Sequence, residues 1–295
     1  MRIIEPLAIT PSMMTASNIP ENDYPAWDVG STYANGDRVI HEHGVWESVQ
    51  ANNVGKNPLN SPTWWYRLGA TNRWRAFDNR LGGMVTGGES ITYSIALTRT
   101  LNALCFFGLN AQSLQVRVIA PGPNVIHDET VQLASREPVG NAWEYRFNQF
   151  TFKGDLVMTG IFMPSGSTVE LTITGGTATQ VGEIFLGNDM EIGVTLTGTS
   201  LGIQDFSKKE PDEFGGVFIV PRPVIDIVNF RFSAPKEGSG RIQSIIRRIT
   251  SKVCVFYAFE GEDTLGTTVA GLLRDYDLDL DATRAFGSLR AESLV

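Results

Sequence analysis

The segment Ile91-Thr92-Tyr93-Ser94-Ile95-Ala96-Leu97 alternates large apolar side chains with small or polar ones. Successive side chains of a β-strand point to opposite faces, so this period of two is typical of a half-buried strand. The pattern returns at Val169-Glu170-Leu171-Thr172-Ile173, and turn signals such as Pro121-Gly122-Pro123 separate the apolar runs. We expect about eight strands over residues 71–187, folded as a jelly-roll β-sandwich.

Charge and composition narrow the class of protein. The 295 residues carry a net charge of −8 at pH 7, and they include 30 glycines and 14 prolines. Clustered Lys and Arg supply most of the affinity for nucleic-acid phosphates, so we expect no nucleic-acid binding. Glu5 and Pro6 interrupt the first apolar run, and no later run reaches the ~18 apolar residues that span a bilayer. We therefore expect no membrane insertion and a mainly β protein rich in turns.

The two ends of the chain differ from its middle. Residues 1–26 hold four prolines and no sustained period, which favours an extended N-terminal arm over a helix or a central strand. Residues 188–295 open with a strand-like run and carry one helical pattern after Ser239. Its apolar stripe, with the spacing of one helix face, is Ile242, Ile245, Ile246 and Ile249. With a strand expected over 253–259, this part is predicted to be an α+β domain.

Aromatic residues crowd the segment 27–70. They are Trp27, Tyr33, Trp46, Trp64, Trp65 and Tyr66. A unit this small has little apolar area to bury, and each aromatic ring supplies about 150–250 Å². Most of these rings are therefore predicted to be structural. Trp64 and Trp65 are neighbours on an extended segment, so one of the two rings should face outward.

This aromatic segment resembles the short carbohydrate-binding modules appended to chitinases and cellulases. The residues that carry the resemblance are Trp27, Tyr33, Gly36-Asp37, Val39, Gly44, Trp46, Pro58, Trp64 and Leu68. Exposed rings in that family stack on the apolar faces of sugars. The resemblance implies a carbohydrate-binding site made by Trp64, Trp65, Tyr66, Asn52 and Asn53. Residues 50–58 are polar where chitinase modules carry further exposed rings, so the ligand it implies is a bacterial surface glycan rather than chitin.

Two other segments resemble tail proteins of phages and prophages. They are Gly69-Ala-Thr-Asn-Arg-Trp-Arg-Ala-Phe-Asp78 and Gly202-Ile-Gln-Asp-Phe-Ser-Lys-Lys-Glu-Pro-Asp-Glu-Phe-Gly215. The unit that ends in Val181-Gly-Glu-Ile-Phe-Leu-Gly187 looks like a galactose-binding-type jelly roll. Together these resemblances imply a structural protein of the tail tip or baseplate, assembled in the host cytoplasm and carried in the virion. The implied partners are other tail proteins and further copies of the chain, as a trimer or hexamer.

No catalytic or metal-binding constellation is recognisable. His41, His43 and His127 have no cysteine or acidic cluster nearby to complete a zinc set. The acidic ladder is Asp275, Asp277, Asp279 and Asp281, which alternates with Tyr276, Leu278 and Leu280. On a strand these carboxylates share one face, and a solvated face is favoured over a calcium site. A glycosidase needs two carboxylates at a fixed separation, which this row does not define. We expect no enzyme activity and no cofactor.

Two alternative functions stay open at this point. In the first, the module packs on other virion proteins in a purely structural ring subunit. In the second, the module accompanies a glycan-degrading enzyme. The apolar neighbours of Cys105 and Cys254 predict buried reduced thiols, with a single disulfide as the other arrangement.

Overall fold

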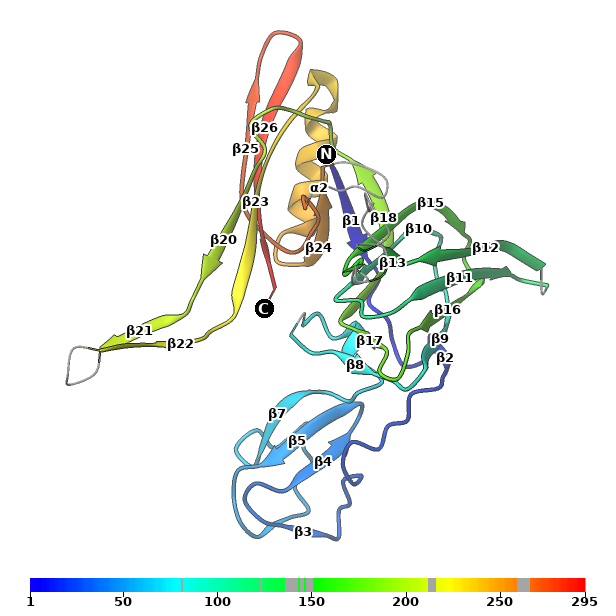
Figure 1. The fold of residues 1–295 in the computed structure, drawn as a ribbon, viewed down its shortest axis with the longest axis vertical. Helices are drawn as coiled ribbons and strands as arrows, with labels where there is room; N and C mark the ends of the chain where they lie inside the picture. The colour runs from blue at the N-terminus through cyan, green and yellow to red at the C-terminus, as the bar shows by residue number, and fades with distance from the viewer. Residues whose placement is uncertain are drawn as a thin grey trace.

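Two antiparallel sheets organise the chain, which is mainly β as predicted (Figure 1). The computed structural model describes residues 1–80, 82–122, 124–135, 143, 146, 151–211, 216–258 and 266–294. One sheet has ten strands and the other has five. Short two- and three-stranded sheets extend from them.

A β-sandwich occupies the middle of the chain. One wall is the five-stranded sheet, in the order β12 (Asn124–Gln132), β11 (Ser113–Ala120), β16 (Thr168–Thr174), β9 (Ser90–Ala96) and β2 (Met14–Ser17). The other wall is one end of the ten-stranded sheet, namely β15 (Leu156–Met163), β10 (Leu101–Phe107) and the first part of β18 (Glu183–Glu191). Every second residue of β9, β11 and β16 is buried in the core between the walls, so the alternation seen in the sequence defines the sandwich.

The ten-stranded sheet continues past the sandwich into the C-terminal part. Its next strands are β1 (Arg2–Pro6), β24 (Val253–Tyr257), β25 (Val269–Leu280), β26 (Arg284–Ser293), β23 (Val224–Pro235) and β19 (Val194–Thr195). The short helix η2 (Lys236–Gly238) leads into α2 (Ser239–Ile249), which lies against this sheet (Figure 1). The four isoleucines predicted to form its apolar stripe are all buried there.

The N-terminal segment differs from its prediction. Residues 2–6 form a central strand, β1, which pairs with β18 on one side and β24 on the other. Asp189 joins all three strands, because its carboxylate pairs with Arg2 at 2.5 Å and accepts a hydrogen bond from the Tyr257 hydroxyl at 2.8 Å. The extended arm was predicted from the four prolines of residues 1–26. The first of them, Pro6, is the last residue of β1 and so does not interrupt the strand. The expected division at 187/188 falls inside β18, so one strand runs through both predicted domains.

The remaining elements are short. The aromatic module holds the pair β3 (Thr32–Tyr33) and β6 (Asn53–Val54) and the sheet β4 (Arg38–His41), β5 (Gly44–Ser48) and β7 (Trp65–Ala70). Helix η1 (Arg75–Phe77) and the pair β8 (Val85–Thr86) and β17 (Gln180–Val181) follow between the module and the sandwich. The last pair in this region is β13 (Ala134–Ser135) and β14 (Thr151–Phe152). In Figure 1 the module stands at one end of the molecule, and the β25–β26 hairpin stands at the other.

A long hairpin arm projects from the C-terminal part of the sheet. Strand β20 (Ser200–Asp205) pairs with the start of β23, and β21 (Lys208–Pro211) pairs with β22 (Val217–Val220) farther out. Figure 1 shows this hairpin arm extending away from the body of the molecule. Its exposed apolar side chains are Leu201, Ile203, Phe206, Val217, Phe218, Ile219 and Val224. Residues 212–215, within the stretch that resembles phage tail proteins, lie outside the described residues.

Several smaller predictions are also resolved. Asp275, Asp277 and Asp279 are exposed on β25, whereas Tyr276 and Leu278 pack against the C-terminal core. The last positions of the acidic ladder depart from the pattern, because Leu280 is exposed and Asp281 lies in the turn after β25. Both cysteines are free and buried, as expected. No helix in the described ranges is long and apolar enough to cross a bilayer.

Candidate carbohydrate-binding surface

Trp65 forms the core of the aromatic module. Its side chain is 2% exposed, its indole Nε1 donates a hydrogen bond to the Lys56 carbonyl at 2.8 Å, and the Tyr33 ring meets it edge-on with centroids 5.2 Å apart. Tyr33 in turn ties the start of the module, because its hydroxyl accepts a hydrogen bond from the Asp28 backbone N–H at 2.7 Å. The buried Trp65 ring and the half-buried Tyr33 ring together compensate for the small size of the unit.

Asn53 and His41 also serve the interior of the module. Asn53 is fully buried, and its Nδ2 donates to the Ser48 hydroxyl at 3.0 Å. The His41 ring meets Trp27 edge-on at 5.0 Å, and its Nε2 lies 3.3 Å from Nδ2 of Asn57. Trp65 and Asn53 therefore do not reach the surface, which corrects the prediction that both contact a glycan.

The other predicted site residues remain accessible. Tyr66 is 62% exposed, and Trp64 is half-buried with the Lys56 ammonium 5.6 Å from its ring centroid. Trp64 lies in the turn that leads into β7, and Tyr66 lies on that strand with its side chain on the face opposite the buried Trp65. Asn52 is exposed in a turn and adopts a positive φ of 58°, a conformation that asparagine tolerates well. Of the Trp64-Trp65 pair, expected to have one outward ring, Trp65 is buried and Trp64 is partly exposed.

A row of side chains crosses the outer face of the module's three-stranded sheet. Tyr66 on β7 lies opposite Glu47 on β5, which lies opposite Arg38 on β4. The Arg38 Nε donates to Glu47 at 2.8 Å, and its Nη1 donates to the Tyr24 hydroxyl at 3.1 Å. The hydrogen bond with Tyr24, followed by that with Glu47, raises the pKa of Arg38. The Arg38–Glu47 ion pair therefore lies between two tyrosines, Tyr24 and Tyr66.

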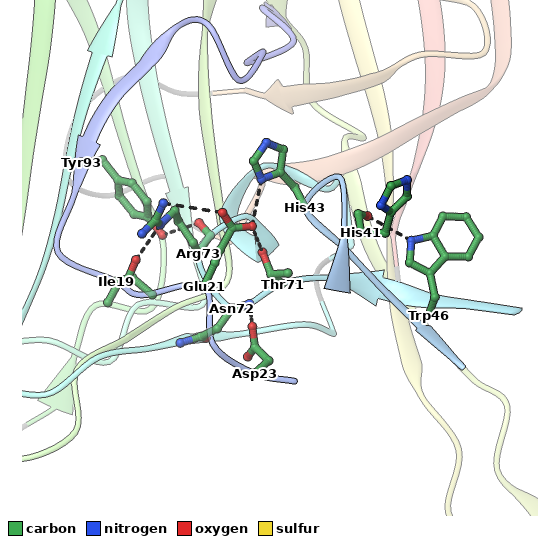
Figure 2. Close-up of polar contacts among 10 residues, drawn as sticks. All are labelled: Ile19, Glu21, Asp23, His41, His43, Trp46, Thr71, Asn72, Arg73 and Tyr93. Carbon is green, nitrogen blue, oxygen red and sulfur yellow. Dashed lines mark hydrogen bonds and ion pairs between the residues drawn. The ribbon is translucent and has the colours of Figure 1, made fainter. Parts of the chain in front are cut away.

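A polar joint holds the module against the sandwich (Figure 2). Glu21 is its centre, because Oε1 lies 2.9 Å from Nδ1 of His43 and accepts a hydrogen bond from the Thr71 hydroxyl at 2.8 Å. The other oxygen lies 3.6 Å from the Arg73 guanidinium. Glu21, which precedes the module, therefore contacts Thr71 and Arg73, which follow it, through one carboxylate.

Further hydrogen bonds extend the joint on both sides. Arg73 Nε donates to the Ile19 carbonyl at 2.6 Å, and the buried Tyr93 of the sandwich donates its hydroxyl to the Arg73 carbonyl at 2.9 Å (Figure 2). The Asn72 backbone N–H donates to the Asp23 carboxylate at 3.0 Å. His43 lies in the turn after β4 at φ 61°, where its ring contacts the central carboxylate of this joint.

An open hollow of about 400 Å³ lies where the outer face of the module meets the segment after the joint. Val45 and Leu68 contribute apolar surface to it, and the charged side chains that line it are Arg38, Arg75, Arg80 and Asp78. Its volume falls in the range typical of small-molecule sites, about 300–1,000 Å³.

The sequence did not reveal the hollow because its lining comes from separate segments. Tyr24 precedes the module, Arg38 lies on β4, and Arg80 follows η1. The pair Gly82-Gly83 also lines the hollow, but in the sequence it indicates only a turn. Tertiary proximity, rather than local spacing, creates this site.

Comparison with known proteins yields two similar structures. No protein-family model matches the chain, and no curated protein matches it. The chain is similar to the crystal structure of chitosan-binding module 1 from a chitosanase/glucanase of Paenibacillus sp. IK-5, with a TM-score of 0.27 and 14% identity over 39% of this chain and 83% of that one. A selenomethionine-labelled mutant of the same module matches with a TM-score of 0.27 and 13% identity over 39% and 84% of the two chains.

Proposed function

We propose that this protein is a non-enzymatic structural subunit of a bacteriophage tail tip that binds a host-surface glycan through its aromatic module. The observation that carries the glycan proposal is the exposed Tyr66 ring, with the partly exposed Trp64 ring near it in the chain, on a module whose core is already filled by Trp65. The ring surface that the core leaves exposed is accessible to a ligand.

Sugar chemistry fits such a surface. A pyranose offers apolar C–H faces flanked by hydroxyl groups, so a site for it combines aromatic rings with polar side chains. Trp64 and Tyr66 supply the rings, and Glu47 and Arg38 lie in register beside Tyr66. The exposed Asn52 adds an amide, and the Gln50 amide donates to the Thr63 carbonyl, which holds its turn next to Trp64.

The shape of the chain supports an assembly role. The hairpin arm exposes apolar side chains on strands that project from the body, and solitary soluble proteins rarely keep such surface uncovered. The arm and the module extend from different parts of the molecule, so a subunit packed through the arm leaves the module accessible. The resemblance of residues 69–78 and 202–215 to phage tail proteins is the basis for placing the assembly in a virion.

Glycan binding is tested with an array of bacterial surface polysaccharides. The whole chain is expected to bind at least one polysaccharide. The double variant Trp64→Ala/Tyr66→Ala is expected to lose at least about tenfold in affinity, because it removes two aromatic rings and an aromatic contact contributes about 0.5–1.5 kcal/mol. Phe162→Ala is the matched control, because Phe162 is an equally exposed ring on the sandwich strand β15.

Two results would count against the proposal. Binding that survives loss of both rings places the site elsewhere, and an absence of binding across the array favours a module that packs on other virion proteins. Release of fragments from a bound polysaccharide would instead support the glycan-degrading alternative.

A further inference from the structure

We propose that the hollow between the module and residues 75–80 and 82–83 is a subsite for an anionic sugar unit, whose acidic group is held by Arg75 and Arg80. This inference rests on the proposed glycan binding by the module and specifies the class of glycan. None of the residues predicted from the sequence to contact sugar lines this hollow.

The hollow has space for a sugar ring beside its arginines. Gly69 and Gly83 contribute only backbone to the wall, with the Arg80 guanidinium 3.8 Å from the place where a Cβ on Gly69 would lie. The Arg75 side chain stands 3.9 Å from the corresponding position on Gly83. Val45 and Leu68 offer apolar surface nearby, which suits the C–H face of a pyranose.

Charge gives the hollow its preference for an anion. Arg38 is paired with Glu47, but the side-chain hydrogen bonds of Arg75 and Arg80 go to the carbonyls of Met84, at 3.4 Å, and Leu68, at 3.1 Å. Asp78 is the one carboxylate among the described residues of the lining. A guanidinium has five N–H donors, so each arginine retains several for a ligand. Arginine recognises carboxylate and phosphate groups with paired hydrogen bonds.

The hollow is continuous with the aromatic surface. Leu68 follows Tyr66 by two residues on β7, and Arg38 belongs both to the row beside Tyr66 and to the lining of the hollow. A glycan stacked on Tyr66 therefore reaches the hollow with its next units. An acidic group on one of those units would meet Arg75 and Arg80.

The experiment compares three probes on the full chain by calorimetry. The first is tetragalacturonate, the second is the same tetramer with each C6 carboxylate reduced to a hydroxymethyl group, and the third is galactose 6-phosphate. Tetragalacturonate is expected to bind at least about tenfold more tightly than the reduced tetramer, with an affinity that falls as NaCl is raised, because exposed charges are screened. Stronger binding of galactose 6-phosphate than of the uronate would identify phosphate as the natural acidic group.

Variants separate this subsite from the aromatic surface. Arg75→Gln/Arg80→Gln is expected to remove the preference for tetragalacturonate, while Arg241→Gln, an exposed arginine on α2, leaves it intact. Gly83→Leu tests the space without changing charge, because a Cβ there meets no atom closer than 3.8 Å. This variant is expected to weaken both tetramers while leaving the unfolding midpoint near that of the parent chain.

The outcomes are distinguishable. Equal affinity for the two tetramers, or a preference that survives the double arginine variant, overturns the acidic subsite. If Trp64→Ala/Tyr66→Ala abolishes binding of the reduced tetramer in the same series, the glycan-binding function stands without the subsite. If neither tetramer nor any array polysaccharide binds, both proposals fail.

Discussion

Glu183 accepts a hydrogen bond from the Arg80 backbone N–H at 2.6 Å, which ties strand β18 of the large sheet to the segment that lines the hollow. Glu183 is fully buried. Burial, followed by the hydrogen bond and charge of Asp78, raises the pKa of Glu183 to about 9. A neutral carboxyl therefore supports the hollow at physiological pH.

This pKa predicts a pH-dependent stability. The folded chain holds the Glu183 proton between about pH 4.5 and 9, where the unfolded chain releases it, so the free energy of unfolding falls as pH rises through that window. Glu183→Gln stays neutral and should show a shallower decline, measured by urea unfolding at pH 5, 7 and 9. Glu89→Gln, at an exposed position, is the control. Parallel slopes for Glu183→Gln and the parent chain would contradict the prediction.

The two neighbouring tryptophans should respond differently to truncation. Trp65→Ala removes a ring that fills the module core and leaves the Lys56 carbonyl without its indole donor, so a loss of about 3–5 kcal/mol is expected. Trp64→Ala should cost less than ~1 kcal/mol, because the ring is partly exposed. Hydrogen exchange of residues 27–70 measures both effects within the module. Similar protection in the two variants would show that Trp65 is not the centre of the core.

The sequence predicted elements whose pattern repeats locally. The alternation around Ile91 and the isoleucine stripe of α2 each follow from one period, and both appear where they were expected. β1 was missed because a five-residue strand carries no period of its own and is specified by Val255 and Asp189, which lie far along the chain.

In the candidate site, too, the sequence predicted only what local spacing determines. Spacing alone placed Trp64 and Trp65 on opposite sides, but the inward position of Asn53 depends on the buried Ser48 hydroxyl that it contacts. Arg75 and Arg80 gain their role only because the joint at Glu21 brings the following segment beside the module.

The hairpin arm should control self-association. Phe218→Asp/Ile219→Asp places two charges on exposed positions of β22, so it should reduce the oligomer without lowering the unfolding midpoint. Sedimentation velocity measures the oligomeric state. Val125→Asp/Ile126→Asp on the exposed sandwich strand β12 is the matched control and should leave the state unchanged. A trimer or hexamer that survives the arm variant would place the subunit contacts elsewhere.

Both thiols should be unreactive in the folded protein. Burial raises the pKa of Cys254 to about 12 and that of Cys105 well above its ordinary value, so neither forms an appreciable thiolate at neutral pH. Titration with Ellman's reagent is expected to detect no thiol in the native chain and two in guanidinium. Rapid native labelling of either cysteine would mean that its surroundings open readily.

The placement of β1 has a consequence for how the chain is made. Residues 2–6 leave the ribosome well before residues 183–191 and 253–257, yet they form the strand that pairs with both of those segments. Until β24 has been made, the largest sheet of the nascent protein is incomplete. The Asp189 carboxylate, which contacts Arg2 and Tyr257 in the folded chain, then lacks its hydrogen bond from Tyr257. Completing the sheet requires contacts of very large sequence separation, which are slow to form. Completion of the sheet therefore waits for the synthesis of β24, and the sandwich and the C-terminal part of the sheet mature together.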